Sequence, residues 1–385
     1  MSKRSAEVPL SGVKVADFSR VLAGPLATMT LADLGADVIK VERRGVGDDT
    51  RQWGPPWSEH GSSYFASVNR SKRSIELDLR DPDDLAVARR LAAEADVVVE
   101  NFLTGTMDRL GLGYDEIAQA NPGVVYCSIT GFGSQEGASL PGYDFVVQAV
   151  GGLMSITGDP EREPTKVGVA LVDVLTGKDA VIAILAALHE RGNSGRGQRV
   201  EVNLLSSLLG SLVNQGSSYL TTGRSPGRMA NQHPSIAPYE TLQCADGLLA
   251  LACGNDGQFA KVAEVLGVPE LATDERFSTN PQRVAHRSDL IAALEAALGH
   301  QPVAMWSEAL NARGVAAGPV ADIGAAIDRA ASLGLEPTVN LGEGHAPQIR
   351  HPITWGRSVL PTPTPPPGLG EHSEQIRASL DKENR

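Results

Sequence analysis

A single carboxylate, Asp173, ends the apolar run Val167–Val172 and stands shortly before a helix predicted over Thr176–Arg191. Two interpretations of this residue are open. Asp173 can cap the N-terminus of the helix, and the spacing alone favours this interpretation. A carboxylate packed among apolar residues at a strand–helix junction is also where a reactive nucleophile would be placed.

Basic side chains recur near the ends of predicted strands in the first 110 residues. They are Arg20, Arg43, Arg44, Arg51, Arg70, Lys72, Arg73, Arg80 and Arg109. Each one alone is accounted for as a solvated surface residue, but in an acidic protein the group could form a pocket for phosphates. Two of them are the best placed to line such a pocket, because Arg43 directly follows a strand and Arg20 lies in the first crossover turn.

Signatures of other enzyme classes are incomplete. The turn Ser19–Pro25 holds one glycine instead of the GxGxxG pattern, so NAD binding is not predicted. The GxSxG pattern at Gly223–Gly227 has Pro226 after the serine, which lacks the N–H that an oxyanion hole needs. We read it as a linker turn, with a serine hydrolase as an alternative. The histidines show no metal-ligand spacing, so no metal is expected. His233, in a loop fixed by prolines, either borders a site or caps the start of a second domain.

Alternating strands and helices must position these residues in the first half of the chain. Strands are predicted at Val13–Phe18, Val38–Glu42, Asp96–Glu100, Val124–Thr130 and Gln198–Leu204, and helices after Gly24-Pro25, after Asp81-Pro82 and around Asp115–Ala120. The run Val97–Val99 is apolar on both faces, as in a parallel strand covered by helices on both sides. The pattern predicts an α/β fold with a Rossmann-like, doubly wound parallel sheet.

The length of 385 residues suggests two or three domains, and the composition changes beyond Gln215. Residues 231–325, which mix short strands with amphipathic helices, predict a smaller α+β domain. The remaining residues divide into a discontinuous large domain at 1–205 and 335–385, and linkers at 206–230 and 326–334.

The net charge of −12 argues against a protein that coats nucleic acid or an anionic membrane. No apolar run reaches the length of a membrane span, and residues 1–10 show no signal peptide, so no membrane partner is expected. Three widely spaced cysteines form no disulfide framework and suit a reducing compartment, which predicts a cytoplasmic location.

Taken together, many ordered motifs resemble the class III CoA-transferases, the family of formyl-CoA transferase, carnitine CoA-transferase and the bile-acid-inducible F protein. The motifs are Val15–Pro25, Leu34–Arg43, Asn69–Leu79, Glu100–Phe102, Asp108–Gly111, Gly142–Asp144, Gly195–Gln198 and Leu369–His372. The resemblance covers nearly the whole chain. It implies an interlocked homodimer, in which a large Rossmann-like domain binds CoA and each chain threads through the other.

The resemblance also assigns roles to residues. Asp173 resembles the nucleophilic aspartate of the family. The positions that contact CoA are Arg20, Val21, Arg43, Leu77, Arg80, Asn101, Phe102 and Arg109. Arg43, Arg80 and Arg109 would bind the adenine–ribose–phosphate end of CoA, and Asn101 and Phe102 would line the pantetheine path. Tyr143 and His233 are expected at the substrate pocket. Arg80 replaces a lysine of the formyl-CoA enzyme, which keeps the charge but changes the donor geometry.

The implied reaction moves CoA from an acyl-CoA to a carboxylic acid through aspartyl anhydride and aspartyl-CoA thioester intermediates. No bound cofactor is expected, because CoA and acyl-CoA are substrates. The loop around His233 is similar to that of branches that use succinyl-CoA and small dicarboxylates. Two alternatives remain. One is an α-methylacyl-CoA racemase, whose Gly-His-Asp motif is here Gly142–Asp144 with a tyrosine in the middle, a poor base near neutrality. The other is a CoA-binding protein without catalysis.

Overall fold

The computed structural model describes residues 8–382 of the chain. The N-terminal residues in which the sequence predicts no signal peptide lie partly outside this range, as do the outermost ends of the predicted large domain. The chain divides into two compact units, which are described separately below. The first consists of residues up to Leu153, Val167–Arg224 and residues from Glu336 onward, and the second of Met154–Lys166 and Ser225–Leu335.

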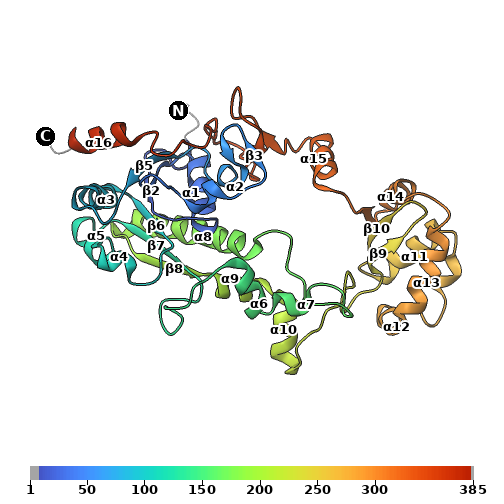
Figure 1. Cartoon of the computed structure of the whole chain (residues 1–385). Helices are drawn as coiled ribbons and strands as arrows, with labels where there is room; N and C mark the ends of the chain where they lie inside the picture. The colour runs from blue at the N-terminus through green and yellow to red at the C-terminus, as the bar shows by residue number, and fades with distance from the viewer. Residues whose placement is uncertain (1–7, 383–385) are drawn as a thin grey trace. The chain divides into compact units, whose positions relative to one another are not determined.

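A six-stranded sheet forms the centre of the first unit (Figure 1). Its strands, in spatial order, are β5 (Arg73–Leu77), β2 (Asp37–Arg43), β1 (Lys14–Asp17), β6 (Val97–Glu100), β7 (Val125–Thr130) and β8 (Arg199–Asn203). Every neighbouring pair is parallel, which confirms the predicted parallel sheet. The order reverses between β1 and β6, and such a switch point is where open α/β sheets bind ligands.

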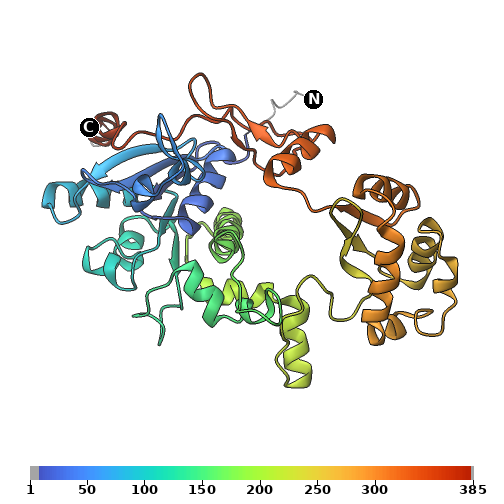
Figure 2. The same ribbon diagram turned by 45° about the vertical axis from the view of Figure 1, so that its right-hand side comes forward.

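Helices cover both faces of this sheet. One face packs against α1 (Ala23–Asp33), α8 (Leu171–Ser194) and α9 (Leu204–Ser211) through side chains that include Val97 and Val99. The other packs against α3 (Pro82–Glu94), α4 (Thr106–Arg109), α5 (Tyr114–Ala120) and the C-terminal α16 (Ser373–Lys382), with Val98 among its buried residues. Successive valines of β6 therefore face opposite layers, which explains why the run is apolar throughout. Figure 2 shows α8 beside α1.

The smaller elements of the first unit surround this sandwich. They are the 3-10 turn η1 (Asp49–Gln52), the strand pairs β3 (Trp57–Ser58) with β4 (Gly61–Ser62) and β12 (Thr338–Val339) with β13 (Gln348–Ile349), and the helices α2 (Ser63–Ala66), α6 (Asp144–Val150) and α10 (Val213–Thr222). The short helix α7 (Leu153–Ile156) stands where the chain first passes to the second unit.

A three-stranded antiparallel sheet and several helices make up the second unit. The strands are β11 (Ala316–Pro319), β10 (Leu248–Ala252) and β9 (Tyr239–Gln243), in that order. The helical elements are α11 (Asp256–Val265), η2 (Pro269–Ala272), α12 (Asn280–Ala285), α13 (Arg287–Leu298), α14 (Val303–Ala312) and α15 (Ile323–Ser332). The core of this unit gathers Leu249, Phe259, Leu294 and Leu310. Its mixture of short strands and helices is α+β.

The segments predicted as linkers contain regular structure. Most of 206–230 is helical, because Asn203 caps α9 by accepting a hydrogen bond from the Ser206 N–H and Leu208 is buried in the core. Residues 326–332 complete α15, which Asp322 caps. Residues 154–166 were placed in the large domain but belong to the second unit, where the Arg228 guanidinium donates to the carbonyl oxygens of Asp159, Pro160 and Arg162.

Candidate active site

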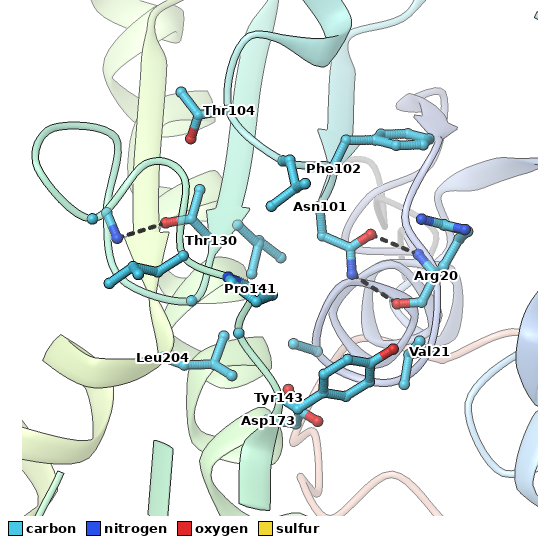
Figure 3. Close-up of a pocket in the computed structure, with 18 of the residues that line it drawn as sticks. Arg20, Val21, Asn101, Phe102, Thr104, Thr130, Pro141, Tyr143, Asp173 and Leu204 are labelled. Atoms are coloured by element: carbon cyan, nitrogen blue, oxygen red, sulfur yellow. Dashed lines mark hydrogen bonds between the residues drawn. The ribbon is translucent and has the colours of Figure 1, made fainter. Parts of the chain in front are cut away.

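A cavity of about 220 Å³ opens at the carboxyl ends of β1, β6, β7 and β8, next to the start of α8. It brings together six residues that the sequence singled out. They are Arg20, Val21, Asn101, Phe102, Tyr143 and Asp173 (Figure 3). These residues come from four separate segments of the chain, and the switch point of the sheet is what assembles them.

Asp173 lies in the first turn of α8, which starts at Leu171 with Ala170 at the N-cap position. The interpretation of Asp173 as the N-cap residue is therefore wrong, because the helix begins five residues earlier than Thr176. The cap comes instead from Asp144 of α6. Its Oδ1 accepts hydrogen bonds from the backbone N–H groups of Val172 (2.7 Å) and Asp173 (3.3 Å). The Asp173 side chain therefore does not cap the helix.

The Asp173 carboxylate is half-buried and accepts no hydrogen bond from any group within residues 8–382. Burial, followed by the like charge of Asp144, raises the pKa of Asp173 to about 7. An ionised carboxylate in this place is poorly solvated, and weak solvation makes a carboxylate more nucleophilic. The group also carries its negative charge in a large fraction of molecules at neutral pH, as attack on a carbonyl requires.

The cap residue Asp144 is itself fixed. It is buried, and its Oδ2 accepts a hydrogen bond from Gln148 Nε2 at 2.6 Å. The Oε1 of Gln148 accepts one from the Val167 N–H at 2.9 Å. This network joins α6 to the segment that leads into α8, so the start of the helix has a defined position beneath the cavity.

Two close backbone approaches bring the cavity walls together. A Cβ on Gly131 would lie 2.5 Å from the Cα of Gly142, and a Cβ on Gly142 would lie 2.4 Å from the Cα of Gly131. Only glycine fits at both positions, which bring the end of β7 against the segment carrying Tyr143. Similarly, a Cβ on Gly177 would meet the Ala23 carbonyl oxygen at 2.7 Å, so α8 packs closely on the start of α1.

The turn between β1 and α1 is joined to the end of β6 by a reciprocal pair of hydrogen bonds. The Arg20 N–H donates to Asn101 Oδ1 at 2.8 Å, and Asn101 Nδ2 donates to the Arg20 carbonyl oxygen at 2.7 Å (Figure 3). The Arg20 guanidinium lies over the Phe102 ring, 5.1 Å from its centre. Asn101 therefore fixes the Arg20 backbone at the cavity wall, and Phe102 contacts the Arg20 guanidinium.

A second cavity of about 400 Å³ lies at the carboxyl ends of β1, β2 and β5. It is lined by Arg43, Leu77 and Arg80, and it shares Arg20 and Phe102 with the first cavity. The Arg43 and Arg80 side chains are more than half exposed, and both form ion pairs with carboxylates, Arg43 with Asp49 and Arg80 with Asp78. Exposed guanidinium groups at one cavity, next to a carboxylate at the other, suit a long ligand with an anionic end.

Two predicted site residues are not brought into either cavity. Arg109 is exposed at the end of α4, where its Nη2 donates to Thr106 Oγ1, and only its neighbour Leu110 lines the second cavity. His233 belongs to the second unit, where its Nδ1 accepts a hydrogen bond from the Ser235 N–H and its ring lies 5.1 Å from that of Tyr239.

Sequence reasoning missed the functional position of Asp144 and the contribution of Asp49, which lines the first cavity and pairs with Arg20. The signal for Asp144 was its place directly after the expected pocket residue Tyr143. Within residues 8–382 no group of three His, Cys, Asp or Glu side chains could hold a metal ion, and no helix is long and apolar enough to cross a membrane.

A doubly wound parallel sheet whose switch point holds a half-buried carboxylate, unpaired among residues 8–382, defines an α/β protein suited to covalent chemistry on a bound ligand. The model of CoA-transferase family III matches residues 10–373, and the chain belongs to this family of enzymes. A succinate–glutarate CoA-transferase of Agrobacterium fabrum is 44% identical, covering 97% of this chain and 96% of the relative. A succinyl-CoA:glutarate CoA-transferase of Mus musculus is 40% identical, covering 96% and 85%.

A solved structure agrees with the family assignment. The crystal structure of a CAIB/BAIF family protein from Brucella suis is 45% identical in sequence, with a TM-score of 0.88, and the match covers 97% of this chain and 100% of that one. The predicted family is thereby confirmed, together with the α/β fold.

Proposed function

We propose that this CoA-transferase moves CoA from succinyl-CoA to a small dicarboxylic acid such as glutarate, with Asp173 as the nucleophile. The names of the Agrobacterium and mouse relatives support the pair of acids. The observation that carries the role of Asp173 is its position: a half-buried carboxylate, unpaired within residues 8–382, lines a cavity at the switch point of the sheet.

The reaction begins with attack of an Asp173 oxygen on the thioester carbonyl, which expels the CoA thiolate and forms a mixed anhydride. The thiolate then attacks the Asp173 carbonyl carbon and releases succinate, leaving an aspartyl-CoA thioester. The acceptor carboxylate attacks that thioester, and the released thiolate takes the acceptor acyl group from the second anhydride. Each step exchanges one activated acyl bond for another, and Asp173 returns as the free carboxylate.

CoA would lie across the two cavities, with its phosphates at the second cavity and its thioester at the first. Arg43 and Arg80, at the second cavity, would bind the phosphates, and Arg109 at the nearby end of α4 would extend this basic surface. The pantetheine arm would pass Leu77, Arg20 and Phe102, the last two of which line both cavities. The thioester would then reach Asp173 beside Val21, Asn101 and Tyr143. No bound cofactor takes part, because the carboxylate and CoA supply the chemistry.

An interlocked homodimer is part of the proposal. Apolar side chains on α6, α9 and α10 are more than half exposed in the single chain, which supports a further protein surface packing there; they are Phe145, Val150, Leu209, Val213 and Leu220. In such a dimer His233 would border the acid pocket. The three cysteines are free and buried, as suits the cytoplasm. Sedimentation of the purified chain at twice its monomer mass would support the dimer, and a monomer would contradict it.

The test follows glutaryl-CoA formation from succinyl-CoA and glutarate by chromatography, and then extends to a panel of mono- and dicarboxylic acids. We expect transfer that Asp173→Ala abolishes and that Asp115→Asn leaves unchanged. Asp115 is a matched control, because it also lies in the first helical turn of its helix, α5, but is exposed. Absence of transfer with every acid would contradict the proposal.

The racemase alternative is separated by a second measurement. The motif that carries the histidine of the racemase acid–base pair has Tyr143 at that position in this chain, and a tyrosine is a poor base near neutral pH. The neighbouring Asp144 carboxylate already accepts hydrogen bonds from Val172, Asp173 and Gln148. We therefore expect no exchange of the α-proton of a 2-methylacyl-CoA in deuterated water. Rapid exchange without an acceptor acid would favour racemisation.

A further inference from the structure

The turn between β1 and α1 holds an unfavourable backbone conformation at the wall of the Asp173 cavity. Val21 has a φ of 70°, in the left-handed region. This region is rarely occupied by a β-branched residue, because its side chain crowds the backbone there. A conformation of this kind persists only where surrounding groups fix it, and such residues often lie at functional sites.

The groups that fix this turn on one side are Asp48 and Lys40. The Val21 N–H donates to both carboxylate oxygens of Asp48, at 3.3 Å each. Lys40 Nζ lies 2.9 Å from Asp48 Oδ2 and donates to the Ser19 carbonyl oxygen at 2.9 Å. The ion pair thus binds the backbone at both ends of the three-residue segment Ser19–Val21.

The pair is rigidly placed and sealed from solvent, with both side chains 0% exposed. Asp48 also accepts hydrogen bonds from the Thr50 N–H and Thr50 Oγ1, and its own N–H donates to Glu42 Oε2 at 3.1 Å. Burial alone would raise the pKa of Asp48, but the Lys40 ammonium and the Thr50 donors lower it below its usual value, so the carboxylate stays charged.

We propose that the buried Lys40–Asp48 pair is a positioning pair for acyl-CoA binding: it holds Val21 in the left-handed conformation and thereby keeps Arg20 and Val21 at the cavity wall. The two side chains lie at the base of the second cavity but are inaccessible, so they act through the turn rather than on the ligand. This inference rests on the proposed function, because it assumes that acyl-CoA occupies the cavities.

The first test measures the steady-state kinetics of Asp48→Asn. Without the charged acceptor, Val21 relaxes toward its preferred conformation in most molecules, and we expect KM for succinyl-CoA to rise about tenfold, with a smaller change in kcat. The control is Asp33→Asn, which removes one partner of the Arg70–Asp33 pair, also buried at 4% exposure for each side chain. It should lower stability similarly and leave KM unchanged.

A second variant covers the case in which the unpaired Lys40 prevents folding. Lys40→Met with Asp48→Asn removes both charges of the pair together and preserves volume, so no ammonium is left without its partner and the chain should fold, since buried ion pairs are often replaceable without loss of stability. KM for succinyl-CoA should still rise about tenfold. Wild-type KM in this folded double variant would overturn the inference.

A double-mutant cycle separates positioning from a general loss of stability. In a Val21→Gly background the residue no longer disfavours the left-handed region, so Asp48→Asn should raise KM about twofold rather than tenfold. The same increase in both backgrounds would overturn the inference. These outcomes differ from failure of the proposed function, in which the unmutated chain itself transfers no CoA.

Discussion

The most informative single change is Asp173→Asn, because the structure predicts that it stabilises the protein while it abolishes transfer. The carboxylate has an ordinary pKa of 3.8 in the unfolded chain and about 7 in the folded chain. The folded state therefore binds the proton more tightly, and the stability linked to this group is fully present below pH 4. It is lost as the pH rises toward 7, because ionisation in the half-buried site is unfavourable.

The magnitude follows from the gap between the two pKa values. At about 1.4 kcal/mol per unit the gap corresponds to about 4 kcal/mol, and water at the half-buried carboxylate reduces this to about 2–4 kcal/mol. An uncharged asparagine does not carry this penalty. Above pH 7 we thus expect Asp173→Asn to unfold at higher denaturant concentration than the wild type, with the difference shrinking steadily between pH 7 and pH 4.

The assay is urea unfolding followed by circular dichroism at several pH values, with the exposed Asp115→Asn as the control. The control should change the free energy of unfolding by less than about 0.5 kcal/mol at every pH. If Asp173→Asn destabilised the protein, or if its effect were the same at pH 5 and pH 8, the carboxylate would not have the raised pKa that the structure indicates.

Three further predictions concern the same site. The kcat/KM for succinyl-CoA should fall about tenfold per pH unit below pH 7 and level off above it, as measured by initial rates, because attack requires ionised Asp173. Asp144→Asn should move that midpoint to lower pH, because it removes the like charge beside Asp173. It should also cost about 1–3 kcal/mol of unfolding free energy, since the amide nitrogen of the new side chain would face Gln148 Nε2 and cannot accept its hydrogen bond. An unmoved midpoint would show that Asp144 does not affect the pKa of Asp173. Asn101→Leu removes both hydrogen bonds to the Arg20 backbone and should raise KM for succinyl-CoA at least tenfold, whereas an unchanged KM would mean that the turn is held without Asn101.

The sheet could be predicted from the sequence because its signals are local. The period of the apolar residues and the capping pair Asp81-Pro82 mark elements within a few residues. The structure places β6 and β7 within one residue of their predicted bounds and starts α3 at Pro82, directly after the predicted cap. The start of α8 could not be predicted in this way. Its cap is Asp144, almost thirty residues earlier in the chain, and no local pattern reports such a contact.

Some of the binding residues could likewise be predicted from the sequence, and others could not. Arg20 and Arg43 were recognisable by their places after strands, since the carboxyl ends of parallel strands share one edge of the sheet. The sequence gives no sign that Lys40 and Asp48 form a buried pair, because charged residues are usually exposed and the pairing depends on how the loop after β2, in which Asp48 caps η1, folds back on the strand. A residue type likewise does not show where its side chain points, which is why Arg109 was expected in a cavity that it does not line.

Trapping the acylated form of Asp173 tests most directly whether this residue is the nucleophile. The enzyme is incubated with succinyl-CoA and then treated with hydroxylamine or borohydride, and the peptide that carries Asp173 is examined by mass spectrometry. If Asp173 is the nucleophile, a hydroxamate or a reduced side chain forms at Asp173 alone, and only when acyl-CoA is present. An unmodified Asp173, together with full transfer activity of Asp173→Ala, would contradict this role.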